Sequence, residues 1–134
     1  MAIRKLERLA EDESLALLRT ATLGRVSVHI GESPAILPVN YVMLDDDVVF
    51  RTAPGSKLTS ALMGARMAFE VDHVDAATGA AWSVLVVGFA EEVRDESTRA
   101  RVDSLGLDSW SPADLSFVVR IGTRQISGRR IPPR

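Results

Sequence analysis

The strongest constraint on the fold is an apolar segment that runs into three consecutive aspartates and then returns. Residues 35–44 are almost unbroken apolar, which is typical of a strand that is covered on both faces. The aspartates at positions 45–47 cannot form a strand centre, so they predict a hairpin turn that residues 48–52 follow as a returning strand. Strands joined this closely pair antiparallel, because a parallel pair needs a long crossover connection.

The rest of the chain also favours strands over helices. Gly88 interrupts the longest expected strand and indicates a bulge or close packing. A small antiparallel barrel suits such a chain, because closure removes exposed strand edges. We expect one domain over residues 1–134, with a helical segment at 1–21 and a basic tail at 128–134. The expected strands are residues 25–30, 35–44, 48–52, 67–74, 82–93 and 115–127. The expected helices are residues 11–21, 57–64 and 95–107. In the last helix Val102 and Leu105 should face inward, and a loop should follow at Ser109–Asp114.

Composition excludes several classes of protein. The chain has no cysteine, so it has no disulfide scaffold, thiolate metal site or cysteine nucleophile. Its net charge of −2 gives no overall attraction to nucleic acid or to an anionic membrane. The first thirteen residues are charged and hold no signal-peptide core, so we expect a cytoplasmic protein without nucleic-acid or membrane partners. His73 lies near Asp72 and Asp75, but a solvated strand end is a better interpretation than a metal site.

One segment, residues 50–58, combines features that suit phosphate. Arg51 and Lys57 provide positive charge, and Thr52 and Ser56 provide hydroxyl groups where a strand runs into a helix. The alternative is an ordinary strand–turn–helix junction in which Ser56 caps the helix. The spacing alone leaves both interpretations open.

Three other features could contact a ligand. Asn40 interrupts an apolar strand and needs hydrogen-bond partners, either in the backbone or on a planar ligand. Trp82, at the start of the longest strand, could belong to the core, a dimer interface or a stacking wall. The Arg-rich C-terminal segment could meet an anionic substrate, and the spacing of Arg120 and Arg124 places both on one surface.

These features occur in an order that resembles one family, the pyridoxamine 5′-phosphate oxidase-like flavin-binding split barrels, in a small actinobacterial-type form. The resemblance extends from about residue 15 to residue 130, and no single motif carries it alone. The motifs are Gly24-Arg25-Val26, Pro38-Val39-Asn40-Tyr41, Phe50-Arg51-Thr52, Gly55-Ser56-Lys57, Phe69-Glu70-Val71-Asp72, Trp82-Ser83-Val84, Val87-Gly88 and Ile126-Ser127-Gly128-Arg129.

The resemblance implies a mainly β, six-stranded antiparallel split β-barrel that forms a homodimer with shared FMN sites. By the same resemblance, Arg51, Thr52, Ser56 and Lys57 would bind the cofactor phosphate. Val39, Asn40, Trp82 and Ser83 would contact the flavin, and Arg129 the substrate.

The implied activity is a flavin-dependent oxidoreduction of a small organic molecule by hydride transfer at flavin N5. It requires no essential catalytic acid or base, and no metal. The alternatives are a deazaflavin coenzyme in place of FMN, a flavin carrier or sensor without turnover, and an interaction module that has lost its cofactor. The C-terminal Arg–Trp segment of the true oxidase is missing here, which argues against oxidation of vitamin B6.

Overall fold

The computed structural model describes residues 4–107 and 116–134. Eight strands and three short helices make up the described part, so the protein is mainly β. No helix in this part is long and apolar enough to cross a lipid bilayer. The elements are β1 (Glu7–Leu9), α1 (Glu11–Leu18), β2 (Leu23–Ile30), β3 (Ser33–Leu44), β4 (Asp47–Thr52), α2 (Lys57–Leu62), β5 (Arg66–Val74), β6 (Ala81–Glu92), α3 (Glu96–Ser104), β7 (Phe117–Ile121) and β8 (Gln125–Ile131).

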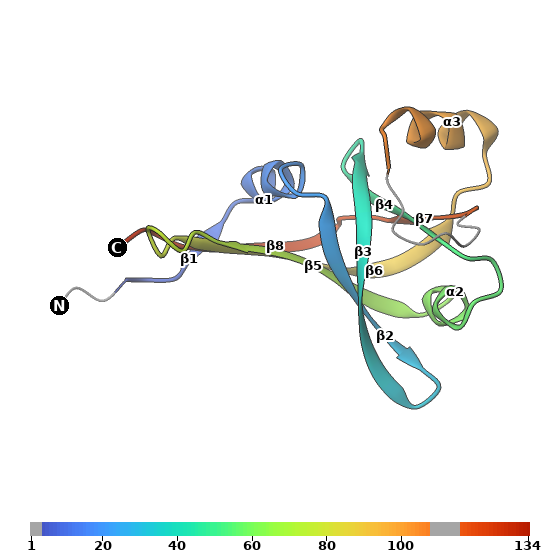
Figure 1. The fold of residues 1–134 in the computed structure, drawn as a ribbon, viewed down its shortest axis with the longest axis horizontal. Coiled ribbons are helices and arrows are strands. Elements are labelled where there is room, and N and C mark those ends of the chain that lie inside the picture. The colour runs from blue at the N-terminus through green and yellow to red at the C-terminus, as the bar shows by residue number, and fades with distance from the viewer. Residues whose placement is uncertain (1–3, 108–115) are drawn as a thin grey trace.

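Six of the strands close into an antiparallel barrel. The strand order is β6-β5-β2-β3-β4-β7, and a pairing of β7 with β6 closes the ring, while β8 and β1 extend from β6 as a flap (Figure 1). β3 pairs with β2 up to Asn40 and with β4 from Tyr41 onward, so it passes from one half of the barrel to the other at this point. The expected split barrel is confirmed.

The barrel interior is filled by alternate residues of the six strands. Phe50, Phe69 and Ile121 are fully buried there, and the edge of one ring of the Tyr41–Phe69 pair faces the other at a centroid distance of 5.0 Å. A smaller apolar cluster lies outside the barrel, where Val102 of α3 packs with Val49 and Val118. Helix α3 therefore covers the outer face of β4 and β7.

Some expectations from the sequence are wrong in detail. The segment expected to be helical over residues 1–21 contains β1, and the expected last strand breaks into β7 and β8 between residues 121 and 125. The basic tail at 128–134 is strand as far as Ile131, because β8 pairs with both β6 and β1.

Two further details concern α3 and Gly88. Leu105 lies beyond the end of α3 and is 45% exposed, so only Val102 of the expected pair faces inward. The β5–β6 register continues through Gly88 without a bulge. Packing is not especially close there either, since a Cβ at Gly88 would lie 3.4 Å from the carbonyl oxygen of Gly122, an ordinary van der Waals contact. The loop at Ser109–Asp114 and the expected strand start at Leu115 lie outside the described residues.

Candidate functional site

Arg51 lies on the outer face of β4, under the end of α3. Its neighbours in sequence, Phe50 and Thr52, are buried, so alternation along the strand turns Arg51 outward. One terminal nitrogen pairs with the carboxylate of Asp103 on α3. The Nε atom is buried and has no hydrogen-bond partner among the described residues. A buried donor without a partner is costly, so this atom is a candidate contact for a ligand oxygen.

The hydroxyl groups of the same segment form a compact cluster that closes the loop between β4 and α2. Ser56 caps α2 by accepting a hydrogen bond from the backbone N–H of Thr59 at 3.1 Å. The Thr59 hydroxyl lies 2.7 Å from the Thr52 hydroxyl and 2.7 Å from the Ala53 carbonyl oxygen. The structure therefore contains the Ser56 cap of the alternative interpretation, an ordinary strand–turn–helix junction, and the cluster fixes the loop that carries Lys57.

Lys57 is the first residue of α2 and is exposed. It makes no ion pair with any residue in the described ranges, so its charge is available to a ligand. A groove of about 630 Å³ lies beside it and is lined by Gly55, His29 and Ser60 among others. Gly55 has a φ of +70°, and a Cβ there would meet nothing within 4 Å. The loop is therefore open in front of Lys57.

Val39 and Asn40 lie where β3 changes partner. The Val39 side chain packs into the barrel core and is 8% exposed, so only its backbone can face a flavin. Asn40 points to the opposite face, is half-buried, and makes no side-chain hydrogen bond within the described part of the chain. The β3–β4 ladder ends at the Tyr41–Phe50 pair, and the next residues along the two strands are Asn40 and Arg51. The register thus brings Asn40 and Arg51 to the same outer face. They lie where β3 passes from β2 to β4, a point called the split below.

Trp82, Ser83 and Arg129 line a second groove, of about 220 Å³, at the start of β6. Ser83 is paired across the sheet with Asp72 of β5 on one side and with Arg129 of β8 on the other. The Trp82 ring is half-buried, partly packed against the core, and 6.4 Å from the ring of His73. Of the three roles open to Trp82, the structure shows packing against the core, and Trp82 is also among the residues that line this groove.

Glu70 lies in the same groove and was not predicted from the sequence. Burial, followed by a hydrogen bond with Asp72 and repulsion from its charge, raises the pKa of Glu70 to about 7, while Arg25 acts in the opposite direction. Arg25 of β2 lies 3.3 Å from the Glu70 carboxylate and 3.2 Å from that of Asp72. The signal in the sequence is the alternation of Glu70 and Asp72, which puts two carboxylates on one face of a strand.

The structure therefore divides the predicted residues into two sets. Arg51, Thr52, Ser56 and Lys57 lie at the end of β4 and the start of α2, and Asn40 joins Arg51 where β3 changes partner. Trp82 and Ser83 lie at the start of β6, paired with His73 and Asp72 of β5. No groove within the described residues contains members of both sets.

Comparison with known proteins places this barrel in a family. The family model of pyridoxamine 5′-phosphate oxidase matches residues 10–130, most of the chain. The chain belongs to the pyridoxamine 5′-phosphate oxidase family. The chain is 35% identical over 133 residues to the uncharacterized protein Rv0080 of Mycobacterium tuberculosis. The alignment covers 96% of this chain and 87% of that relative.

Solved structures agree with this assignment. A protein described as the FAD binding protein from Mycobacterium smegmatis superposes with a TM-score of 0.81 at 36% identity, covering 94% of this chain and all of that one. A conserved protein of unknown function from Corynebacterium diphtheriae, DIP1874, superposes with a TM-score of 0.76 at 35% identity, covering 95% of this chain and 98% of that one. The family resemblance expected from the sequence motifs is confirmed.

Proposed function

We propose that this protein binds a flavin, FMN, and uses it to oxidise or reduce a small organic molecule. The observation that carries the proposal is the buried Nε of Arg51, which has no partner among the described residues and lies beside the split of the barrel. The family assignment and the flavin named for the M. smegmatis relative support it. That relative is described with FAD, so FAD and a deazaflavin coenzyme are the alternatives to FMN.

The residues present fit a flavin phosphate. Arg51 and Lys57 supply positive charge, and the Thr52–Ser56–Thr59 hydroxyl cluster holds their loop in one conformation. Asn40 offers a free amide at the split, suited to the polar edge of a planar ring. A bound flavin supplies the hydride chemistry, and the protein's part is to hold the ring and leave one face open to the substrate.

We further propose that each flavin site is shared by two copies of the chain. Arg51 and Lys57 of one copy would bind the phosphate, and Trp82 and Ser83 of the other copy would flank the ring. This arrangement is supported by the grooves of the described residues, none of which holds members of both sets. Arg129, on the neighbouring strand, would then face the substrate side.

The proposal includes no essential catalytic acid or base. Glu70 is the sharpest test of that statement, since it is the carboxylic acid in the Trp82 groove whose pKa lies near neutrality. In the flavin-loaded protein, the Glu70→Gln variant should keep its turnover. Loss of turnover with flavin still bound would show that Glu70 moves a proton in the reaction.

Flavin binding is tested by absorption spectra of the purified protein with FMN, FAD and the deazaflavin coenzyme in turn. The Arg51→Ala/Lys57→Ala variant should lose about 100-fold in FMN affinity, because two charged contacts of about 1.5 kcal/mol each are removed. The matched control is Lys5→Ala/Arg94→Ala, which removes one exposed lysine and one exposed arginine elsewhere. Equal losses in both variants, or no binding of any flavin by the parent protein, would contradict the proposal.

A further inference from the structure

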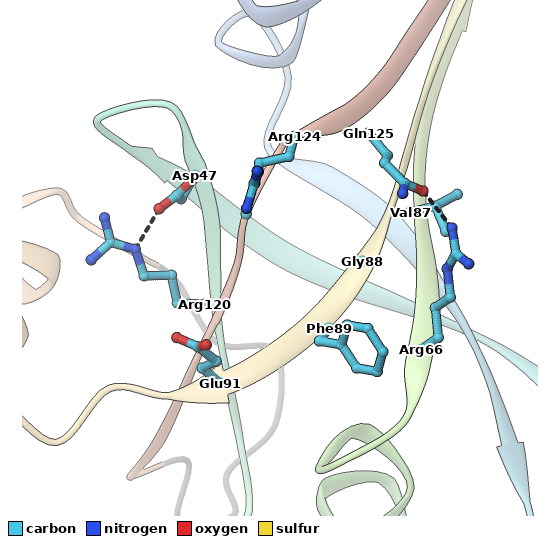
Figure 2. A pocket seen from close by; sticks show the side chains of 10 residues that line it. Asp47, Arg66, Val87, Gly88, Phe89, Glu91, Arg120, Arg124 and Gln125 are labelled. Atoms are coloured by element: carbon cyan, nitrogen blue, oxygen red, sulfur yellow. Dashed lines mark hydrogen bonds and ion pairs between the residues drawn. The ribbon is translucent and has the colours of Figure 1, made fainter.

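A third groove, of about 760 Å³, lies on the outside of the barrel at the far end of β6. It opens where β6 changes neighbour, from β8 at the Val87–Gln125 pair to β7 at the Ala90–Ile121 pair. None of the residues predicted to bind flavin lines it. The side chains that surround the opening are Asp47, Arg66, Phe89, Glu91, Arg120 and Arg124 (Figure 2).

The floor of the groove includes two glycines, Gly88 and Gly122. Gly88 shares the core-facing alternation of Val86 and Ala90, and a Cβ there would lie 3.4 Å from the carbonyl oxygen of Gly122 and 3.9 Å from the buried Ile121. A Cβ at Gly122 would meet only Asp47, at 3.9 Å. Gly122 has no positive φ, so a side chain there would fill the groove without straining the backbone. The absence of a side chain at Gly122 thus creates space for a ligand.

The three arginines at the rim differ in their partners. Arg120 donates from Nε to the Asp47 carboxylate at 2.6 Å, and Arg66 donates to the side-chain oxygen of Gln125. Arg124 is exposed and makes no hydrogen bond or ion pair within the described ranges. Glu91, the other acidic residue of the lining, is paired in register with Arg120, beside which Figure 2 shows it. With three arginines against Asp47 and Glu91, the lining keeps one net positive charge, and Arg124 is the guanidinium left to bind an anion.

Phe89 adds an apolar surface to the same groove. It is 60% exposed, and Figure 2 shows its ring across Gly88 from the Arg124 side chain. A groove lined by an exposed phenylalanine and an arginine without a partner suits a flat, negatively charged molecule, since the ring provides a stacking surface and the guanidinium provides paired donors.

We propose that this groove binds a small planar anion, with its ring against Phe89 and its phosphate or carboxylate group on Arg124. The volume is sufficient for a molecule of mononucleotide size, since ligand pockets of this kind span about 300–1,000 Å³. The site is separate from the proposed flavin site and does not depend on it.

The test uses the purified protein without added flavin, with the Arg51→Ala/Lys57→Ala variant alongside, so that probe binding at the proposed flavin phosphate site is distinguished from binding at this groove. Adenosine 5′-monophosphate and 1-naphthoate are titrated separately, and the backbone amides of Gly88 and Gly122 are followed by NMR. We expect saturable shifts of both amides with at least one probe. Neutral adenosine and naphthalene-1-methanol, which lack the anionic group, should bind about tenfold more weakly or worse. A phosphate ligand and a carboxylate ligand are distinguished by which probe binds.

Three variants localise the binding. Arg124→Gln should lower the affinity for the effective probe about tenfold, and Phe89→Leu about fivefold, while Gly122→Val should abolish binding by filling the floor. The control is Arg94→Gln, which changes an exposed arginine outside this groove and should have no effect. All four variants must keep the parent's amide spectrum away from the groove.

Several results would overturn the proposal. Shifts confined to the Gly55–Lys57 loop would show that the probes bind at the proposed phosphate site. Equal affinity for charged and neutral probes, or an unchanged affinity in Arg124→Gln, would rule out recognition of an anion. Broadening of the Gly88 and Gly122 amides that depends on protein concentration and not on the probe would show that this face is a contact between copies.

Discussion

Two parts of the candidate site, the Arg51 end at the junction of β4 and α2 and the Trp82 end at the start of β6, hold their polar side chains in different ways. At the Arg51 end, the chain itself supplies most of the partners: Asp103 pairs with the guanidinium, and Thr59 bridges Ser56 and Thr52. At the Trp82 end, two carboxylates share one arginine, and the groove that Trp82 helps to line stays open. Polar side chains are thus bound mainly to one another at the first end, whereas at the second they border an open groove.

The largest expected effect comes from mixing two defective chains. If each site is shared, both sites are damaged in a homodimer of Arg51→Ala/Lys57→Ala chains and in a homodimer of Trp82→Ala chains. A mixed dimer has one intact site, because Arg51 and Lys57 come from the Trp82→Ala chain and Trp82 comes from the other chain. Co-expressed chains with different affinity tags, purified through both tags, should therefore bind one FMN per dimer with the parent's affinity.

Absence of recovered binding in the mixed dimers would place both ends in one chain's own site. A monomer in sedimentation at micromolar concentration would remove the shared site altogether. As a control, mixing either defective chain with itself should recover nothing.

The next effect concerns the Trp82 end, where β8 packs tightly on α1. A Cβ at Gly128 would lie 2.3 Å from the Ser14 hydroxyl oxygen and 3.2 Å from the Leu9 Cβ, and Ser14 is fully buried. Gly128→Ala should therefore lower the free energy of unfolding by about 2 kcal/mol, as overpacking does. Urea denaturation measures this change. The neighbouring, exposed Ser127→Ala should change it by less than about 0.5 kcal/mol, and an equal loss in the two variants would contradict the packing argument.

The hydroxyl cluster at the Arg51 end can be weakened in a comparable way. Thr59→Val keeps the shape of the side chain but leaves the buried Thr52 hydroxyl without its partner, which should cost about 1–2 kcal/mol of unfolding free energy. Flavin affinity should fall with it, because Lys57 follows the loop. Ser60→Ala, on the exposed face of the same helix, is the control. A stable variant with unchanged affinity would show that the cluster does not organise the site.

The smallest effect is a pH dependence at the Trp82 end. Folding raises the pKa of Glu70 to about 7 from its ordinary value of 4.5, so between these values the folded protein binds more protons than the unfolded chain. Stability due to this group is therefore full below pH 4.5 and is lost as the pH rises through 7. Glu70→Gln should flatten the fall in urea midpoint between pH 5 and pH 7.5. An identical slope in parent and variant would assign the dependence to another group.

The sequence predicted the barrel strands well because their patterns are local. Alternation in residues 67–74 and the aspartate turn after residue 44 reappear as β5 and as the β3–β4 hairpin. β1 could not be predicted in this way, since it is three residues long and pairs with β8 at the other end of the chain. The break between β7 and β8 is likewise stabilised at long range, because the Thr123 hydroxyl donates to the carbonyl oxygen of Asp46 at 2.6 Å.

The candidate site shows the same division. Arg51, Ser56 and Lys57 could be selected from residue type and spacing. The burial of the Arg51 Nε could not be, because it depends on α3 folding back over β4. The raised pKa of Glu70 depends on burial and on Asp72. Arg120 and Arg124 do line one groove, as their spacing suggested, although they do not belong to one continuous strand.

Strand β6 has a consequence for how this protein can change. It begins at the Trp82 groove and ends at the Arg124 groove. It is paired with β5 from Ala81 to Phe89, while β8 and β7 share its other edge. Inserting or deleting one residue inside β6 would turn every following side chain to the opposite face, exchanging buried valines for exposed residues. Both grooves can therefore be altered by substitution, but a change of chain length is tolerated only in turns such as the one after Ile30, where Gly31 has open space around it.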